Sequence, residues 1–209
     1  MKLSYAARTD VGMIRTGNED NFVVDANGDR SVFMVADGMG GHAAGEVASE
    51  MAVQIVVREL KEVKGIGGTA TKALGNALRS ANRAIHDRTI TEVDKQGMGT
   101  TASVLMLGDS RYLIGQVGDS RIYLVRQGQT HQLTEDHSLV NELIRRGKLK
   151  REDADKSVYA QYKNAVTRAV GVYESVEVDT FDFDMLPGDN FLLCTDGLYP
   201  YFDDDKIST

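Results

Sequence analysis

The sequence predicts a layered α+β fold, and three observations lead to this prediction. Short segments rich in β-branched and aromatic residues form two groups, one near the N-terminus and one after residue 99. Between the groups, apolar residues recur at three- and four-residue spacing, which is typical of helices that face a core. Gly-Asp and Pro-Gly turn signals separate the later segments, and this close spacing favours antiparallel strands over parallel crossovers.

The first group of β-rich segments predicts an opening strand and a hairpin. Residues 3–10 alternate modestly and are expected to form the opening strand. Residues 22–24 and 31–36 flank a turn signal at residues 27–29, so they are expected to pair as a hairpin. The second strand of this hairpin is expected to end at Asp37.

Two helices are expected next, separated by a glycine-rich break at residues 65–68. The first begins near Ala43, and its apolar stripe comprises Ala48, Met51, Ala52, Ile55, Val56 and Leu60. The stripe of the second comprises Ala73, Leu74, Ala77, Leu78, Ala81 and Ile85. Both stripes are interpreted as core-facing, with no cofactor box in either.

The second half of the chain returns to a strand pattern. Strands are expected at residues 102–107, 112–117, 121–125, 176–183 and 191–195. The first three are interpreted as an antiparallel meander, and the last two as a pair around the turn at residues 187–189. The charged and polar stretch 136–163 has only brief helical signals and is interpreted as an exposed insert.

Composition narrows the class of protein. The 209 residues suit a single domain, and no repeat or linker divides them. The net charge of −7 argues against binding nucleic acid, and the apolar runs are too short to cross a membrane. A lone Cys194 permits no internal disulfide and fits the reducing cytoplasm. The negative charge is explained either by solubility or by a site that attracts cations, and composition leaves both open.

Three aspartates at the ends of expected strands carry the functional signal. Asp37, Asp119 and Asp196 each follow an apolar segment, and a glycine follows the first and the last. Carboxylate and carbonyl oxygens are the ligands that hard divalent cations such as Mg²⁺ and Mn²⁺ prefer. One cysteine and four histidines without ligand spacing disfavour a zinc site. Taken singly, Asp-Gly is a common turn dipeptide, so the pattern alone leaves a metal site and ordinary turns as alternatives.

Five motifs resemble those of the PPM, or protein phosphatase 2C, family, most closely its bacterial members. They are residues 15–20, 36–42, 99–102, 117–121 and 194–198, which read RTGNED, ADGMGGH, GTTA, VGDSR and CTDGL. They stand in the order of the family and span nearly the whole chain. The resemblance implies a four-layer α-β-β-α sandwich, in which two antiparallel sheets are flanked by helices. It also implies a metal-dependent serine/threonine protein phosphatase that uses a metal-activated hydroxide without a phosphoenzyme.

The resemblance assigns the metal ligands residue by residue. Asp37 would bridge two Mn²⁺ or Mg²⁺ ions, Gly38 would offer its carbonyl to one of them, and Asp196 would bind the other. Asp119 would form a third, looser site together with Asp196, so two or three ions are expected.

Three further residues near the N-terminus complete the implied site. Glu19 would hold metal-bound water or touch the metal directly, and Asp20 would support that network. Arg15 would grip the substrate phosphate, because a planar guanidinium can make two parallel hydrogen bonds to it. Without the motif, a surface salt bridge from Arg15 to Glu19 or Asp20 would be favoured.

The sequence departs from the family pattern in two places. Met39 stands where some relatives have a histidine thought to act as the general acid, and His42 is interpreted as structural. The family continues after the Asp196 motif with a helix and strands, one of which bears a further metal-binding aspartate beside an asparagine. The expected domain, residues 1–209 with a flap-like insert at 136–163, lacks these elements. The chain is interpreted as a fragment of a longer protein or, less favoured, a naturally shortened form.

The implied partners are phosphorylated proteins, with a cognate serine/threonine kinase and its targets as candidates, and a monomer is expected. A catalytically impaired module that binds phosphoproteins is the alternative from the same fold. A purely structural cluster of acids is the third reading.

Overall fold

The computed structural model describes residues 2–26, 30–41, 43–202 and 204–207. The strands are β1 Asp20–Asp25, β2 Ser31–Met39, β3 Gly99–Thr100, β4 Ala102–Leu107, β5 Arg111–Val117, β6 Arg121–Arg126, β7 Gln129–Gln132, β8 Asp179–Asp184 and β9 Asn190–Cys194. The α-helices are α1 Ala43–Leu60, α2 Gly68–Thr91, α3 Leu139–Arg145 and α4 Asp204–Ile207. Short 3-10 turns are η1 Val93–Lys95, η2 Arg151–Lys156, η3 Ala160–Tyr162 and η4 Tyr199–Tyr201.

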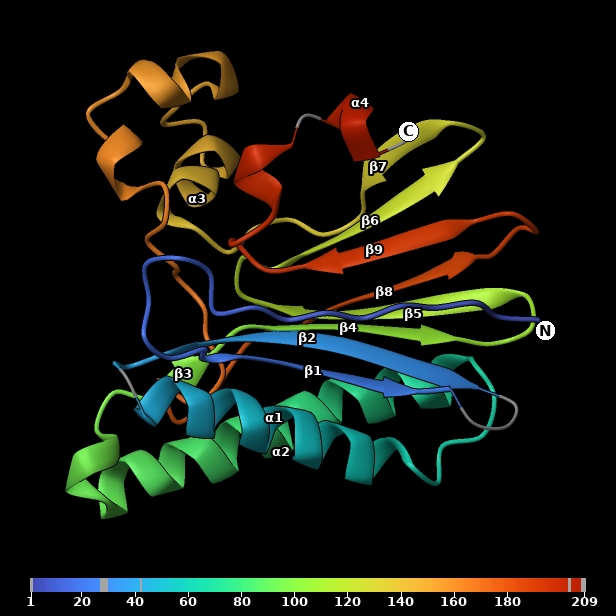
Figure 1. Cartoon of the computed structure of the whole chain (residues 1–209), viewed down its shortest axis with the longest axis horizontal. Coiled ribbons are helices and arrows are strands. Elements are labelled where there is room, and N and C mark those ends of the chain that lie inside the picture. Colours follow the sequence, from blue (N-terminus) through green and yellow to red (C-terminus); the bar gives the residue numbers. More distant parts are fainter. Residues whose placement is uncertain (1, 27–29, 42, 203, 208–209) are drawn as a thin grey trace.

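The strands form two antiparallel sheets that face each other (Figure 1). The larger sheet has the order β1-β2-β4-β5-β8, with β3 paired to the end of β2, and the smaller has the order β7-β6-β9. The long helices α1 and α2 cover the outer face of the larger sheet. The predicted α+β class with two antiparallel sheets is confirmed. On the far side of the smaller sheet, the described residues form short elements, namely α3, α4 and the 3-10 turns η2, η3 and η4.

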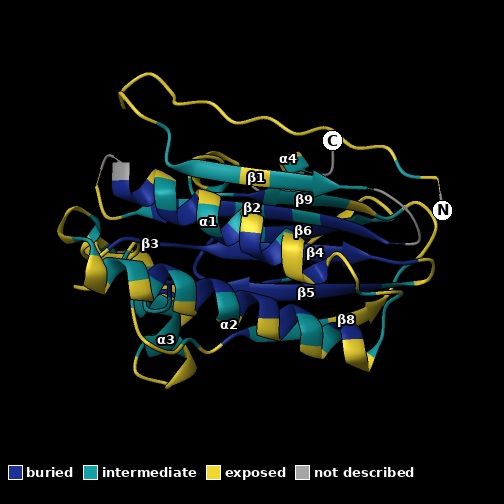
Figure 2. Cartoon of the chain, turned by 90° about the horizontal axis from the view of Figure 1, so that it is seen from below, coloured by how far each residue is buried: buried dark blue, intermediate teal, exposed yellow. Residues whose placement is uncertain are grey.

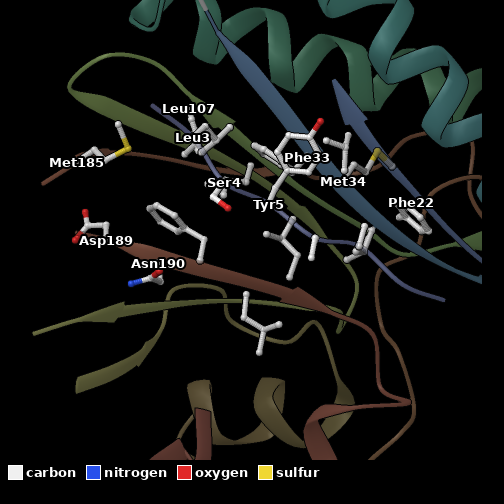
Figure 3. Close-up of a pocket in the computed structure, with 18 of the residues that line it drawn as sticks. Leu3, Ser4, Tyr5, Phe22, Phe33, Met34, Leu107, Met185, Asp189 and Asn190 are labelled. Carbon is white, nitrogen blue, oxygen red and sulfur yellow. The ribbon is translucent and has the colours of Figure 1, made fainter. Parts of the chain in front are cut away.

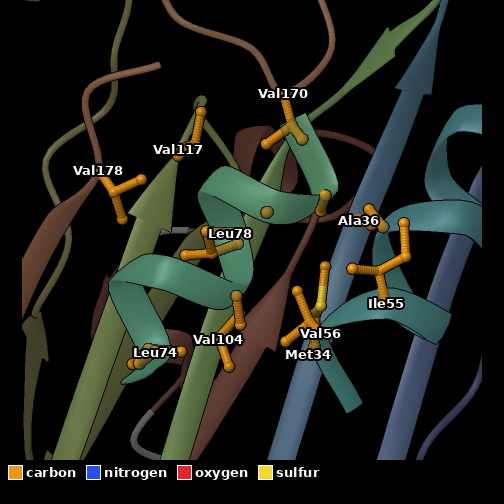
Figure 4. Close-up of a cluster of buried hydrophobic side chains, with 14 of the residues drawn as sticks. Met34, Ala36, Ile55, Val56, Leu74, Leu78, Val104, Val117, Val170 and Val178 are labelled. Atoms are coloured by element: carbon orange, nitrogen blue, oxygen red, sulfur yellow. The ribbon is translucent and has the colours of Figure 1, made fainter. Parts of the chain in front are cut away.

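The main core lies between the two long helices and the larger sheet (Figures 2 and 4). Leu74 and Leu78 of α2 and Val56 of α1 pack there against Met34 and Val104 of the sheet, and all five are at most 1% exposed. Every residue of β4 is buried, because one face meets the helices and the other meets the smaller sheet. Both helices and the helical stripes were predicted from spacing alone, and only Met51 of the first stripe is less than fully buried.

The chain passes from one sheet to the other between β5 and β6, so two pairing predictions are wrong. β4 and β5 form the expected hairpin, but β6 pairs with β7 and β9 instead of continuing the meander. Likewise β8 pairs with β5 and β9 pairs with β6, so the last two strands are not partners. Short connections favour pairing of consecutive strands, but the β5–β6 and β8–β9 connections each cross from one sheet to the other. The crossing at residues 118–120 therefore places Asp119 between the sheets' ends.

The hairpin of β1 and β2 forms as predicted, with one difference at its end. β2 does not stop at Asp37 but continues to Met39, because β3 pairs with Gly38 and Met39. The turn predicted at residues 27–29 lies outside the described residues, as does His42.

The predicted opening strand is absent, since residues 3–10 follow an extended path without ladder pairing. Tyr5 instead packs edge-on against Phe33, with ring centroids 6.0 Å apart. This segment and β9 border a cleft of about 830 Å³ between the sheets (Figure 3). Leu3, Tyr5 and Phe33 point into the cleft, which is mainly apolar and holds none of the predicted site residues.

The insert at residues 136–163 projects from the sandwich between β7 and β8 and carries α3, η2 and η3 (Figure 1). Its middle is exposed as predicted, but its base is not. His137 and Ser138 are 7% and 5% exposed. Ser138 caps α3 through its side chain and pairs with Val166, which draws the two ends of the insert together.

Candidate metal centre

Asp37 lies near the end of β2, and its main chain is fixed from both sides of the peptide unit. The Asp37 N–H donates to the Thr101 hydroxyl at 2.9 Å. The Asp37 carbonyl accepts from the Thr101 N–H at 2.9 Å and from the Thr100 hydroxyl at 3.0 Å. Both threonines are at most 1% exposed. These bonds hold the Asp37 backbone rigidly at the end of the sheet.

Glu19 and Asp20 reach the same end of the sheet through the first residues of β1. The Glu19 carbonyl accepts from the Gly38 N–H at 3.1 Å and from the Ser49 hydroxyl of α1 at 2.6 Å. In the ladder, Asp20 is the direct partner of Asp37. The two predicted residues are therefore held against Asp37 by the hairpin itself.

Gly38 and Gly45 allow β2, α1 and the Glu19 side chain to approach very closely. A Cβ on Gly38 would lie 2.2 Å from the Gly45 carbonyl oxygen and 2.6 Å from that of Glu19. A Cβ on Gly45 would lie 2.9 Å from the Glu19 carboxyl carbon. Neither contact tolerates a side chain, because real Cβ atoms essentially never come within 3.0 Å of other heavy atoms. The two glycines are thus required for the Glu19 carboxylate to reach the end of the sheet.

Asp119 lies on the crossing between the sheets. The preceding Gly118 has φ of +101°, and a Cβ there would lie 2.6 Å from the Thr101 Cγ2 atom. The following Ser120 hydroxyl lies 2.7 Å from the Thr101 hydroxyl, which also binds Asp37. One buried threonine therefore links the main chains that carry two of the predicted ligands.

Asp196 follows β9, the neighbour of β6 in the smaller sheet. The adjacent Thr195 hydroxyl donates to the Asp20 carboxylate at 2.9 Å, which joins the end of the smaller sheet to the start of β1. Residues from both sheets thus meet at one end of the sandwich.

Electrostatics show how close the four aspartates lie. Burial, and then the negative charges of Asp20 and Asp196, raise the pKa of Asp37 to about 8. A hydrogen bond to Asp196 and the charge of Asp119 act in the same direction. A carboxyl whose ionisation is opposed by three others lies in a concentrated negative field. Divalent cations would relieve that field.

The neighbouring carboxyls respond in the same way. Burial and the charge of Asp196 raise the pKa of Asp119 to about 6. Burial is also the main cause that raises the pKa of Asp20, and the charge of Asp196 adds to it. Arg15, which is exposed on the loop before β1, opposes this effect on Asp20 through its positive charge. The alternative of a salt bridge from Arg15 is not seen among the described residues.

The donor set fits hard divalent cations. The Glu19 Oε1 atom is buried and has no hydrogen-bond partner among the described residues. This oxygen is therefore available as a ligand for a cation or a water at the edge of the aspartate cluster. Within the described ranges, no group of three or more His, Cys, Asp or Glu side chains is arranged so that it could hold a metal ion by itself. A cation at this end of the sandwich would therefore also need main-chain carbonyls and water as ligands, which Mg²⁺ commonly uses.

Comparison with known families identifies the origin of this arrangement. Residues 15–208 match the family model described as Protein phosphatase 2C. The chain belongs to the protein phosphatase 2C family.

Individual relatives agree with this assignment. The serine/threonine phosphatase stp of Listeria innocua is 45% identical over 195 residues, which cover 91% of this chain and 76% of that protein. The serine/threonine phosphatase of S. agalactiae shares the fold with a TM-score of 0.87 and 34% identity, over 96% of this chain and 82% of that one. The catalytic domain of PstP in complex with two manganese ions has a TM-score of 0.81 and 35% identity, over 97% and 81% of the two chains. The chain is thus an enzyme, a serine/threonine protein phosphatase of the bacterial 2C type.

The structure brings six of the seven predicted site residues together at one end of the sandwich, with Arg15 on the loop that leads into it. Sequence reasoning missed the residues that support them, namely Gly45, Ser49, Thr101, Thr195 and His137. Gly45 lies in a run of small residues after the Asp37 motif, and that run was an available signal. Thr101 lies within the GTTA motif, but the motif itself gives no indication of its contact with Asp37.

No helix within the described ranges is long and apolar enough to cross a membrane.

Proposed function

We propose that this enzyme hydrolyses phosphoserine and phosphothreonine esters of proteins with two Mn²⁺ or Mg²⁺ ions, and a third held more loosely. The observation that carries the proposal is the meeting of acids from both sheets at one end of the sandwich. Asp20 lies directly opposite Asp37 in the ladder, and Thr195, the neighbour of Asp196, donates to the Asp20 carboxylate. Burial, together with the charges of Asp20, Asp196 and Asp119, raises the pKa of Asp37 to about 8. A bound cation would offset this field and allow all four carboxylates to ionise together. When bound, the ions supply a water that ionises near neutral pH and positive charge opposite the phosphoryl oxygens.

Each ligand has a proposed role. Asp37, the Gly38 carbonyl and Asp196 would hold the two ions, with Asp37 shared between them. Asp119 would hold the third ion together with Asp196. The main chain of Gly38 packs directly against the carbonyl oxygens of Gly45 and Glu19, and this close packing fixes the position of its peptide.

Two acids in front of Asp37 complete the arrangement. Glu19 orients a water through its buried, unpartnered Oε1 atom. Asp20 supports that water from behind and is itself held by the Thr195 hydroxyl at 2.9 Å. Attack on phosphorus is direct and forms no phosphoenzyme, so no side chain is needed as a nucleophile.

Arg15 binds the substrate phosphate. It is exposed, it forms no ion pair among the described residues, and its charge is felt by Asp20. It is therefore free to make two parallel hydrogen bonds to a phosphoryl group that approaches the acids. Phosphorylated proteins, including a cognate serine/threonine kinase and its targets, are the proposed partners of a monomeric, cytoplasmic enzyme.

The proposal is tested by replacing Asp37 with asparagine, which keeps the size of the side chain and removes the bridging charge. We expect Mn²⁺-dependent hydrolysis of p-nitrophenyl phosphate to fall about a thousandfold or more, because both ions lose their shared ligand. Calorimetric titration should show that Mn²⁺ binding is lost as well.

Asp184→Asn is the matched control, because Asp184 has a side chain that is 83% exposed on β8. It should retain full turnover and metal binding. Wild-type turnover by Asp37→Asn would refute the proposed site. Binding of a phosphothreonine peptide without turnover or metal dependence would point to a binding module instead.

A further inference from the structure

Two adjacent residues at the base of the insert, Asp136 and His137, form hydrogen bonds with the chain on both sides of Asp119. The Asp136 carboxylate binds the Arg121 guanidinium, with Oδ2 2.6 Å from Nη2 and Oδ1 2.9 Å from Nε. His137 binds Gly118 twice: its main-chain N–H donates to the Gly118 carbonyl at 3.0 Å, and its ring Nδ1 accepts from the Gly118 N–H at 3.0 Å. The bonded residues stand directly before Asp119 and two positions after it.

The bond to Gly118 fixes the protonation state of the His137 ring. A main-chain N–H can only donate, so Nδ1 carries a lone pair and the ring proton of the neutral form lies on Nε2. Nε2 lies 3.0 Å from the Asp179 Oδ2 atom and donates to it. The charged form would place a second N–H against that of Gly118, so the ring is neutral. Burial, the main influence, lowers the pKa of His137 and favours the same form.

The ring is oriented from its other side by a network of charged side chains that runs outward to the surface. Asp179 is the first residue of β8 and accepts a hydrogen bond from Arg168 at 3.0 Å. Arg168 in turn forms an ion pair with Glu177 at 3.0 Å. The His137 carbonyl accepts from the Thr167 N–H at 2.7 Å, where the chain returns from the insert. His137 thus joins the insert, β8 and the crossing that carries Asp119.

The backbone conformation of Gly118 sets the direction in which the Asp119 side chain points. Its φ of +101° lies in the region that glycine adopts readily and other residues rarely do. Glycine also has the greatest backbone freedom, so a rotation at Gly118 would swing the Asp119 carboxylate away from Asp37 and Asp196. The two hydrogen bonds from His137 restrain that rotation.

We propose that His137 is a positioning residue: its neutral ring, oriented by Asp179, holds the Gly118 N–H and thereby fixes the direction in which Asp119 faces the cation site. The role of Asp119 in binding a cation rests on the proposed function. The restraint of Gly118 by His137 is independent of it.

The test compares two variants that each keep one of the ring's two polar contacts. In His137→Asn, the amide oxygen occupies the position of Nδ1 and still accepts from Gly118, but the contact to Asp179 is lost. In His137→Gln, the amide nitrogen reaches the position of Nε2 and still donates to Asp179, but the acceptor for Gly118 is lost. His131→Gln is the control, because His131 is an exposed residue of β7.

The first measurement is made on the metal-free protein by nitrogen-15 NMR. In the wild type, the ring spectrum should show the proton on Nε2 of His137. The Gly118 amide should exchange with solvent about tenfold faster in His137→Gln than in the wild type, because a buried donor has lost its acceptor. In His137→Asn, the rate should stay within about threefold of the wild type. A ring proton on Nδ1, or equal exchange in the two variants, would overturn the proposal.

The second measurement follows Mn²⁺, both by calorimetry and by the concentration that half-saturates turnover. His137→Gln should weaken the loosest ion about tenfold, which is the usual effect of losing a residue that orients a ligand. KM for p-nitrophenyl phosphate should be unchanged, and His137→Asn should restore most of the affinity. Faster Gly118 exchange with unchanged Mn²⁺ affinity in His137→Gln would overturn the link to the site.

Asp119→Asn separates this result from the proposed function. If that variant binds Mn²⁺ like the wild type, the assignment of Asp119 as a ligand fails. The restraint of Gly118 is then judged by the exchange rates alone.

Discussion

Two sets of aspartates in this protein differ in whether they are paired with an arginine. Asp136 and Asp189 each bind an arginine through two bonds, and the hydrogen bond from Arg126 is the main cause that lowers the pKa of Asp189. Asp37 and Asp119, at the end of the sandwich, form no ion pair with a lysine or arginine among the described residues. Burial and the charges of neighbouring aspartates, Asp196 among them, raise the pKa of Asp37 to about 8 and the pKa of Asp119 to about 6.

The difference shows what each set is for. An aspartate paired with arginine is stabilising because its charge is neutralised where it lies. The carboxylates near Asp37 oppose folding once they are ionised, and none of them forms an ion pair with a lysine or arginine within the described ranges. Under the proposed function, ions from solution would take the place of such a partner. Pairing with arginine therefore separates structural acids from the acids of the site.

Replacing Asp189 with alanine tests the structural set and has the largest expected effect on stability. The Asp189 side chain is 2% exposed and accepts from Arg126 at 2.7 and 2.8 Å and from the Leu186 N–H at 2.8 Å. Its loss should destabilise the protein by about 3 kcal/mol, which lowers Tm by about 6–12 °C in thermal unfolding. Mn²⁺-dependent turnover at 20 °C should be unchanged. A fall in Mn²⁺ affinity would contradict the assignment of Asp189 to the structural set.

Replacing Arg15 with alanine tests the only arginine proposed to face the second set. Losing charge-assisted hydrogen bonds worth about 2 kcal/mol should raise KM for a phosphothreonine peptide about thirtyfold. kcat should change less, because the guanidinium grips the phosphate in the ground state as well as in the transition state. Tm should not move, since Arg15 has no ion pair among the described residues. Arg8→Ala, which removes an exposed arginine paired with Asp10, is the control, and an unchanged KM in Arg15→Ala would contradict the assignment.

The sequence predicted the parts of this structure that depend on local spacing. The stripes of α1 and α2 need only the helical period, and the strand at Ala102–Leu107 was placed to the residue. The pairing of β6 with β9 was missed because an apolar pattern does not specify which neighbour a strand selects. Residues 3–10 alternate like a strand, but a strand also needs a ladder partner, and none forms among the described residues.

The residues of the site also differ in whether local sequence predicts them. Asp37, Asp119 and Asp196 were found because each follows an apolar strand in sequence. The roles of Gly45 and His137 arise from contacts with residues distant in sequence, so local patterns do not predict them. Gly45 lies so close to the Glu19 carboxyl that no Cβ fits between them, and the His137 ring nitrogen accepts from the Gly118 N–H. His137 was read as part of an exposed insert, although it is 7% exposed.

The last prediction concerns the sign of the pH dependence in the metal-free protein. The pKa of Asp37 is raised in the folded state to about 8, so its contribution to stability is fully present below its unfolded pKa of 3.8 and is lost as the pH rises through 8. Asparagine mimics the protonated acid at every pH. Asp37→Asn should therefore raise Tm by about 2–4 °C at pH 8.5, which corresponds to about 1 kcal/mol, and leave it nearly unchanged at pH 5.

The opposite sign is expected for Asp189, whose lowered pKa gives stability that is present above its unfolded pKa and lost as the pH falls. Asp189→Asn should therefore lower Tm at pH 8.5 and matter less in strong acid. Mn²⁺ should raise the Tm of the wild type at pH 8.5 and not that of Asp37→Asn, because only the wild type keeps the bridging carboxylate. Equal Tm shifts in the two asparagine variants would mean that both sets of aspartates are structural, and the distinction between them would fail.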